Sequence, residues 1–245
     1  MTTTTRPAAQ TTLSAPTQVG TLASMQVGSP HLHASADAPG GQNPDVRRWR
    51  TSFFRTPSME PRWLYTTHLD GNQQADTKNH GSLNQAVLLY GAAHYPVWRA
   101  ELSLVEIGPG GFGENFTIEG MTEATACIGD TYAIGEARIQ VTGPRYPCWK
   151  IERRWGVAGL TARVAATGRT GWYCRVTHEG LIEPGAPLML VDRPYPKWTM
   201  ALVNDFGHGR NHDGATAAAL SACPLLDGWW PGVINLQLRE KRALV

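Results

Sequence analysis

The sequence predicts a mostly β protein of the α+β class, with short helices around the strands and a small helical appendage at the C-terminal end. Glycine and proline are frequent, at 26 and 17 of 245 residues, and this composition indicates many turns. The apolar runs of strand length are short, and turn residues separate them. Beyond Pro196 the apolar residues follow a helical spacing instead. A hydrophobic content of 42% indicates a globular chain with a substantial core.

Composition and charge argue against several broad classes. The net charge is only +2, so we expect neither nucleic acid nor an anionic membrane as a general partner. No apolar run approaches the roughly 20 residues that span a bilayer, and the N-terminus lacks the apolar segment of a secretory signal. The four cysteines are far apart and form no C-x-x-C pair, so we predict neither a disulfide framework nor a zinc finger. A reduced, cytoplasmic protein is the expectation.

The N-terminal part begins with a segment of low apolar content. Residues 1–20 contain mainly Thr, Ala, Pro and Gln, and we expect a disordered tail there. A domain of strands is expected over residues 21–194, starting with a strand at Thr21–Val27 and a long polar loop at Gly28–Asp45. Arg47–Arg55 then alternates basic and apolar residues. An amphipathic strand with a solvated basic face is our preferred interpretation, and a basic wall of an anion pocket is the alternative.

Two short helices are predicted in the next part of the chain. Ser82 and Gln85 stand three residues apart in front of an apolar run, which is the pattern of a capping box. We therefore predict a helix over Leu83–Tyr90, ended by Gly91. Pro96 suits the first turn of a second short helix.

A glycine-rich turn occupies the middle of the chain, where residues 108–115 read GPGGFGEN. Glycine permits positive φ and lets backbone N–H groups converge on an anion. No Gly-Lys-Ser/Thr follows and no βαβ unit surrounds the turn, so neither a Walker loop nor a dinucleotide fingerprint is indicated. By pattern alone, Glu114 and Asn115 are turn residues. Short strands are predicted next, over Thr131–Ile134 and Ala137–Thr142.

Cys148 differs from the other cysteines in its surroundings. Pro144 and Pro147 fix φ and give it a stiff, extended approach. Arg145 and Lys150 add positive charge, which favours the thiolate, both a nucleophile and a soft metal ligand. We identify Cys148 as the candidate reactive cysteine. The remaining cysteines lie in apolar settings and are interpreted as buried: Cys127, Cys174 and Cys223.

After Cys148, the sequence predicts two short helices, then a strand, then further helices. A short basic helix is expected over Trp149–Trp155, a second over Leu160–Ala166, and a buried strand over Leu188–Val191. Residues 195–245 predict a small domain of three helices. These are Lys197–Phe206, Ala215–Ala222 and a last helix from an N-cap at Asp227 to about Lys241.

Several motifs follow one another in a fixed order: GPGGFGEN, IGD, GEA-x-x-Q-V, P-R-x-P-C-x-K and GRTGWY. In this order they resemble the MOSC domain, a module related to the C-terminal part of molybdenum-cofactor sulfurases, and in particular its stand-alone YiiM-like members. The resemblance covers the chain from about Thr21 onward. It implies a MOSC-type β-barrel with short peripheral helices, followed by the three-helix appendage.

The resemblance also implies a cofactor and a site. The cofactor is a molybdenum cofactor of the molybdopterin type, and the Cys148 thiolate is the implied ligand of its metal. The implied cofactor-binding residues are Gly110, Gly111, Phe112, Gly113, Glu114, Asn115, Arg145 and Lys150.

Two further residues enter the implied site through a separate motif. Gln74-Ala75-Asp76 and His80-Gly81 match the family pattern, whereas Asn72 and Ser82 depart from it. A lone histidine is more often structural than catalytic, and only the resemblance favours a role for His80. Asp76 or His80 would relay a proton beside Cys148 and Arg145, which complete the implied catalytic set.

The resemblance implies a reductase of N-hydroxylated compounds such as hydroxylaminopurines. The chain carries no flavin, haem or iron–sulfur motif, so we expect a separate electron donor protein or a small reductant. Two alternatives remain open, a persulfide carrier that uses Cys148 and a non-enzymatic barrel that binds a cofactor. An exposed apolar patch on the C-terminal helices would permit a homodimer.

Overall fold

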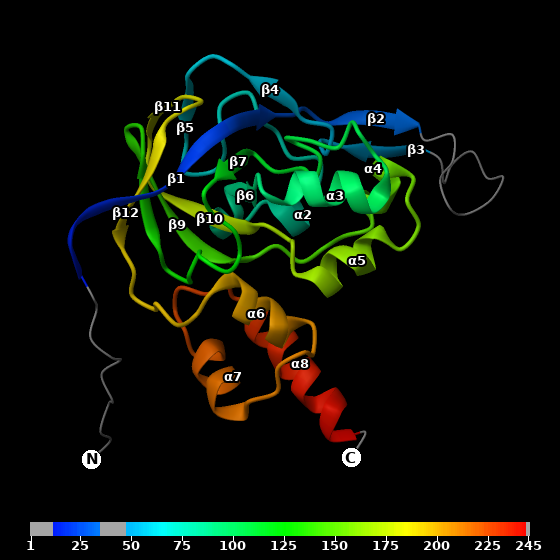
Figure 1. Ribbon diagram of the computed structural model, residues 1–245, viewed down its shortest axis with the longest axis vertical. Helices are drawn as coiled ribbons and strands as arrows, with labels where there is room; N and C mark the ends of the chain where they lie inside the picture. The colour runs from blue at the N-terminus through cyan, green and yellow to red at the C-terminus, as the bar shows by residue number, and fades with distance from the viewer. Residues whose placement is uncertain (1–11, 35–47, 244–245) are drawn as a thin grey trace.

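The computed structural model describes residues 12–34 and 48–243, and within this part seven strands close into a barrel (Figure 1). Neighbouring strands are antiparallel, with the parallel pair β6 and β7 as the exception. In the order of their pairing, the strands are β12 (Pro187–Asp192), β8 (Thr131–Ile134), β9 (Ala137–Pro144), β10 (Trp172–His178), β6 (Val87–Gly91), β7 (Phe116–Glu119) and β1 (Thr12–Val27).

The long strand β1 closes the barrel by changing partners along its length. Its first part pairs with β12 and its second part pairs with β7, with a shift of register in each pairing. Such bulges bend a strand and let it leave one neighbour for another. The strand begins at Thr12, so the disordered tail expected for residues 1–20 is wrong for residues 12–20. Residues 1–11 lie outside the described part.

Shorter strand pairs extend the barrel. A strand β4 (Thr56–Ser58) pairs with the end of β1, and β5 (Arg62–Leu64) pairs with β11 (Gly180–Ile182). A hairpin of β2 (His31–Ala34) and β3 (Arg48–Thr51) projects beside α4 (Figure 1).

This hairpin bears on two of the expectations. Exposed and buried residues alternate along β3, as expected for an amphipathic strand. The prediction of a long loop over Gly28–Asp45 is wrong at His31–Ala34, where the chain forms β2. Residues 35–47 lie outside the described part.

The helix predicted over Leu83–Tyr90 is wrong. Only Leu83–Gln85 forms a 3-10 helix, with the Ser82 hydroxyl accepting from the Asn84 N–H at 3.2 Å, and β6 follows directly. Every residue of β6 is buried, because the strand lies between β10 and β7. A strand buried on both faces has a continuous apolar run, which periodicity alone does not distinguish from a helix.

Short helices surround the end of the barrel that carries the glycine turn. They are α2 (Thr77–His80), α3 (His94–Leu102), α4 (Lys150–Trp155) and α5 (Leu160–Thr167), and the last three were predicted from the sequence, α3 with Pro96 in its first turn. Buried residues of α3, α4 and α5 share a core with Phe112 of the glycine turn: Trp98, Ile151, Leu160 and Val164. Among the described residues, no helix has both the length and the apolar composition to cross a bilayer.

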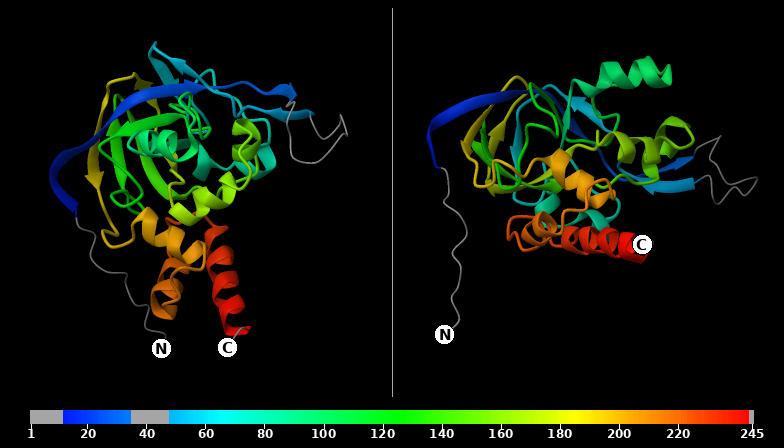
Figure 2. Two further views of the ribbon diagram at one scale, coloured as in Figure 1. Left: turned by 45° about the vertical axis from the view of Figure 1, so that its right-hand side comes forward. Right: turned by 60° about the horizontal axis from the view of Figure 1, so that its bottom comes forward.

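The three C-terminal helices form a layer beneath the barrel (Figures 1 and 2). They are α6 (Met200–Gly207), α7 (Gly214–Ser221) and α8 (Trp230–Ala243), close to the predicted ranges. Their buried residues belong to the same core cluster as the barrel interior. The fully buried ring of Trp230 fits between Gly143 of β9 and Gly207 of α6, where a methyl group on either glycine would lie within 3 Å of it.

Replacing Gly207 by alanine is expected to lower the free energy of unfolding by about 1–3 kcal/mol, because overpacking strains a filled core. The added methyl group would lie 2.3 Å from the Trp230 ring. Urea unfolding followed by circular dichroism measures the change. Gly214→Ala is the matched control, since this glycine is exposed and has no atom within 4 Å of the added group. Equal stability of the two variants would show that Trp230 does not anchor the helical layer.

Candidate functional site

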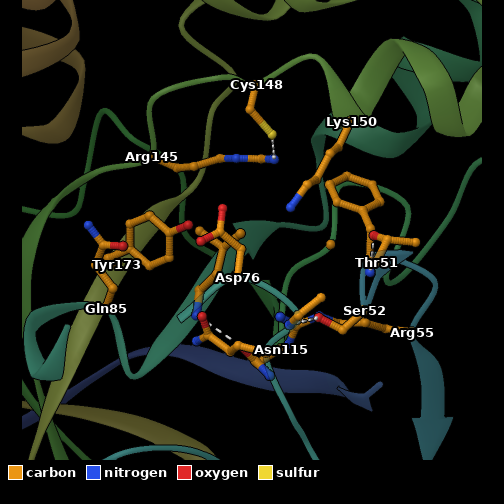
Figure 3. Close-up of a pocket in the computed structure, with 15 residues that line it drawn as sticks. Thr51, Ser52, Arg55, Asp76, Gln85, Asn115, Arg145, Cys148, Lys150 and Tyr173 are labelled. Atoms are coloured by element: carbon orange, nitrogen blue, oxygen red, sulfur yellow. Dashed lines mark hydrogen bonds between the residues drawn. The ribbon is translucent and has the colours of Figure 1, made fainter. Parts of the chain in front are cut away.

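A pocket lies where the β2–β3 hairpin, the segment before α2, the glycine turn and the loop after β9 converge (Figure 3). The space accessible to water molecules in this open pocket is about 60 Å³, which is room for a few of them. Its lining residues are Thr51, Ser52, Phe53, Arg55, Gln74, Ala75, Asp76, Gln85, Leu88, Gly113, Asn115, Arg145, Cys148, Lys150 and Tyr173.

Cys148 stands at one side of this pocket and is partly exposed, whereas the other three cysteines are buried. Its backbone carbonyl accepts hydrogen bonds from the Ile151 N–H at 3.1 Å and the Thr161 hydroxyl at 3.2 Å. These bonds join the loop to α4 and α5. The sulfur itself accepts from the Arg145 Nη2 at 3.6 Å. The sequence prediction of one accessible cysteine beside positive charge therefore agrees with the geometry.

Arg145 is almost fully buried, with 4% of its surface exposed. Its Nη1 donates to the Phe112 carbonyl at 2.8 Å, and its backbone N–H donates to the Gly171 carbonyl at 2.9 Å. One guanidinium thus contacts both the glycine turn and the Cys148 sulfur. Charge-assisted hydrogen bonds of this kind hold two loops at a defined distance.

Arg55 supplies a second cation, from the end of the basic segment. Its Nε and Nη1 atoms are buried and have no hydrogen-bond partner among the described residues. The pKa of Arg55 is lowered to about 10, mainly by burial and also by Arg145, while Glu114 acts in the opposite direction. A buried donor without a protein partner is available to a ligand or to water. For Arg55, the alternative of a basic pocket wall describes the structure better than the preferred solvated face.

Lys150 and Asp76 point into the same space, as Figure 3 shows. Lys150 is the first residue of α4, and Asp76 precedes α2. The pocket thus combines the cations of Arg55, Arg145 and Lys150 with one carboxylate. His80, the other predicted proton carrier, ends α2, and its side chain lies outside the described part.

Tyr173 and Gln85 line the pocket although the sequence prediction did not include them. The Tyr173 hydroxyl points toward Asp76 in Figure 3. Burial raises the pKa of Tyr173, while Arg145 lowers it and Cys148 raises it. Gln85 donates to Asp227 at 3.2 Å, and its own Oε1 is buried without a partner in the described part. Tyr173 lies in the GRTGWY motif, which was the one signal that could have identified it.

The glycine turn is organised by the buried carboxylate of Glu114. This carboxylate accepts from the Gly110 N–H at 2.7 Å, the Phe112 N–H at 3.1 Å and the Thr117 hydroxyl at 3.0 Å, and from the Tyr95 hydroxyl. Two more N–H groups of the turn bond to its own carbonyls, Gly111 to Gly108 and Gly113 to Gly110.

These bonds correct the prediction that the turn offers its N–H groups to an anion. These N–H groups are already hydrogen-bonded within the turn, and the turn presents carbonyl oxygens instead. The Gly111 carbonyl accepts from the Trp155 indole at 2.8 Å, and the Phe112 carbonyl accepts from Arg145. Of the predicted turn residues, Gly113 and Asn115 line the pocket, whereas Gly110, Gly111, Phe112 and Glu114 do not. Asn115 accepts from the Leu88 N–H at 3.2 Å, so its amide also holds strand β6.

Tyr146 joins the Cys148 loop to the C-terminal helices. Its ring stacks on His208 at 4.9 Å and meets the Trp229 ring at 5.4 Å. Burial lowers the pKa of His208 to about 4, and Arg210 acts in the same direction. The neutral imidazole is therefore part of the packing between the loop and the helical layer.

Residues 76–189 match the family model of the MOSC domain. YflK of Bacillus subtilis is 36% identical over 189 residues, which cover 76% of this chain and 84% of YflK. The chain belongs to the MOSC domain family. The matched range of this MOSC protein contains Asp76, the glycine turn, Arg145, Cys148 and Tyr173.

The fold comparison agrees with this assignment. The crystal structure of YiiM from Geobacillus stearothermophilus matches the MOSC protein with a TM-score of 0.71 and 28% identity, over 89% of this chain and 99% of YiiM. The predicted MOSC-type barrel with its YiiM-like appendage is therefore confirmed. A protein of Gibberella moniliformis named "Reductase" is 34% identical over 182 residues. That match covers 72% of this chain but 32% of the fungal protein, so the chain spans about a third of its length.

Replacing Glu114 by glutamine is expected to lower the free energy of unfolding by about 2–3 kcal/mol, because a neutral amide accepts less strongly and turns an NH₂ toward N–H donors. Thermal and urea unfolding measure the loss. Glu119→Gln is the matched control on an exposed position of β7. If both variants unfold alike, the carboxylate does not organise the turn.

The pH dependence of unfolding tests the His208 packing. In the unfolded chain a histidine titrates near pH 6.5, so between about pH 6.5 and 4 the unfolded state binds the proton first. Stability is therefore complete above pH 6.5 and declines as the pH falls toward 4. His208→Phe keeps a stacked ring but has no group that titrates in this range. Its free energy of unfolding should therefore fall by about 1–3 kcal/mol less than that of the native chain between pH 6.5 and 4, as measured by urea unfolding at several pH values. His178→Phe, at an exposed position of β10, should leave the decline unchanged.

Proposed function

We propose that this MOSC protein is an oxidoreductase that binds a molybdenum cofactor and reduces N-hydroxylated compounds, hydroxylaminopurines among them. One observation carries the proposal. An accessible cysteine sulfur lies 3.6 Å from a buried guanidinium, in a pocket that two further cations line. The name of the fungal relative, "Reductase", supports a redox role.

The residues of the pocket fit such a cofactor. A thiolate is a soft ligand suited to a metal that changes oxidation state, and Cys148 would hold the molybdenum. Arg55 has two buried nitrogen atoms without partners, and with Arg145 and Lys150 it would bind the anionic groups of the cofactor. When bound, the cofactor supplies the two electrons that reductive cleavage of an N–O bond requires.

The chain's own groups would supply the protons. Conversion of an N–OH group to N–H releases water and consumes two protons and two electrons. Tyr173 keeps its proton at neutral pH because burial raises its pKa, so its hydroxyl can donate to the departing oxygen. Asp76, toward which that hydroxyl points, would take part in the relay and receive protons from solvent. Arg145 and Lys150 would stabilise negative charge on the oxygen as it leaves.

The electrons would come from a separate donor, either a protein or a small reductant. Reducing equivalents therefore have to reach the bound cofactor from outside the pocket.

Cys148→Ala is expected to abolish metal retention and turnover. Chain loaded with cofactor under anaerobic conditions should hold about one molybdenum per molecule and reduce 6-hydroxylaminopurine with a chemical reductant, whereas Cys148→Ala should do neither. Elemental analysis measures the metal, and chromatography of the purine product measures the reaction. Cys223→Ser, at a buried cysteine of the helical layer, should retain both properties.

Two results would contradict the proposal. Molybdenum binding and turnover that survive Cys148→Ala would exclude the thiolate ligand. A mass increase of one sulfur on Cys148, without bound molybdenum after loading, would favour a persulfide carrier instead.

A further inference from the structure

Gln85 lines the pocket and has an amide oxygen without a hydrogen-bond partner. The residue ends the 3-10 helix Leu83–Gln85, and only 9% of its surface is exposed. Its Oε1 atom is buried and unpaired among the described residues, although a buried acceptor ordinarily has a donor. A ligand in the pocket would supply that donor.

The partner of the amide nitrogen fixes the orientation of this side chain. The Gln85 Nε2 donates to the carboxylate of Asp227 at 3.2 Å, and both side chains are buried. An ionised carboxylate only accepts hydrogen bonds, so a flipped amide would place two acceptors against each other. In Figure 3 the amide nitrogen points away from Tyr173 and Asp76, and the oxygen lies on their side. Gln85 can therefore offer the pocket an acceptor and not a donor.

Backbone hydrogen bonds hold both members of this pair in place. The Gln85 N–H donates to the Ser82 carbonyl at 2.8 Å, and the Asp227 N–H donates to the Thr142 carbonyl of β9 at 2.8 Å. Asp227 belongs to the segment between α7 and α8. The helical layer thus determines which atom of Gln85 is available on one wall of the pocket.

The other walls indicate what kind of ligand group Gln85 would contact. Arg55, Arg145 and Lys150 are donors, which suit anionic and other accepting atoms. The Gln85 oxygen is a neutral acceptor and suits an N–H group instead. Two sources of such a group follow from the proposed function, the hydroxylamino group of the substrate and the amino group of the cofactor's pterin ring.

We propose that Gln85, oriented by Asp227, is a specificity-determining residue whose amide oxygen binds an N–H group of the ligand. This inference rests on the proposed function for the identity of that ligand. A ligand without a hydrogen at this place would leave the buried oxygen unpaired, which weakens binding by roughly 5- to 150-fold.

Two ligands that differ in their donors test the substrate as the source. Calorimetric titration of the cofactor-loaded protein, without reductant, compares 6-hydroxylaminopurine with its N,O-dimethyl analogue, which keeps the ring and the N–O bond but has no hydrogen on the hydroxylamino group. The native chain is expected to prefer the first ligand by about 10-fold or more, and Gln85→Leu should reduce this preference below about threefold. Gln140→Leu is the matched control and should keep the preference, since Gln140 bonds to Arg175 on the barrel and does not line the pocket.

Retention of the cofactor tests the other source. If the pterin amino group is the donor, Gln85→Leu should weaken cofactor binding by about 10-fold and leave the preference between the two purines unchanged. Molybdenum content and pterin fluorescence after dialysis measure the retention.

An exchange of the two side-chain groups separates recognition from a loss of folding. Gln85→Glu combined with Asp227→Asn keeps the net charge and the hydrogen bond, now donated by the amide at position 227, and leaves a carboxylate oxygen for the ligand. This double variant should bind within about threefold of the native chain.

The inference is overturned if Gln85→Leu changes neither the preference between the purines nor the retention of the cofactor, because water then satisfies the oxygen. It is also overturned if the double variant binds as weakly as Gln85→Leu. Binding that depends on Gln85, without turnover once reductant is added, would contradict the proposed reaction and leave the inference standing.

Discussion

The site depends on the buried guanidinium of Arg145. It donates to the Phe112 carbonyl and approaches the Cys148 sulfur, so one side chain sets the distance between the glycine turn and the cysteine loop. A buried cation is unfavourable unless acceptors surround it, and the Cys148 sulfur is one of the acceptors that Arg145 contacts. The positions of Cys148 and Arg145 therefore depend on each other.

Glu114 stabilises the glycine turn that Arg145 contacts. By accepting the Gly110 and Phe112 N–H groups, its carboxylate holds the turn in which the Phe112 carbonyl accepts from Arg145. The turn is thus a scaffold for Arg145. Its glycines serve a close approach, since Gly113 has φ +75° and a Cβ there would lie 2.9 Å from the Phe53 ring.

The pocket carries more positive than negative charge, with Arg55, Arg145 and Lys150 against Asp76. Cations held together without an equal number of carboxylates favour an anionic ligand, and the unpaired nitrogens of Arg55 add specific donors. The C-terminal helices contribute through packing, because Tyr146 of the cysteine loop stacks on His208 and Asp227 bonds to Gln85. The cysteine loop, the barrel and the helical layer are therefore packed and hydrogen-bonded to one another around the site.

The sequence by itself determined the fold class, the three C-terminal helices and the single accessible cysteine. These follow from local properties, namely helical spacing, turn residues and the charged neighbours of Cys148 along the chain. Only the tertiary structure decided that Val87–Gly91 is a strand, because burial between two neighbours outweighs a local helix signal. It also decided that the turn presents carbonyls, and that Arg55 and Tyr173 reach the pocket. Those outcomes depend on contacts between residues far apart in the chain, such as Arg145 with Phe112, which no local pattern encodes.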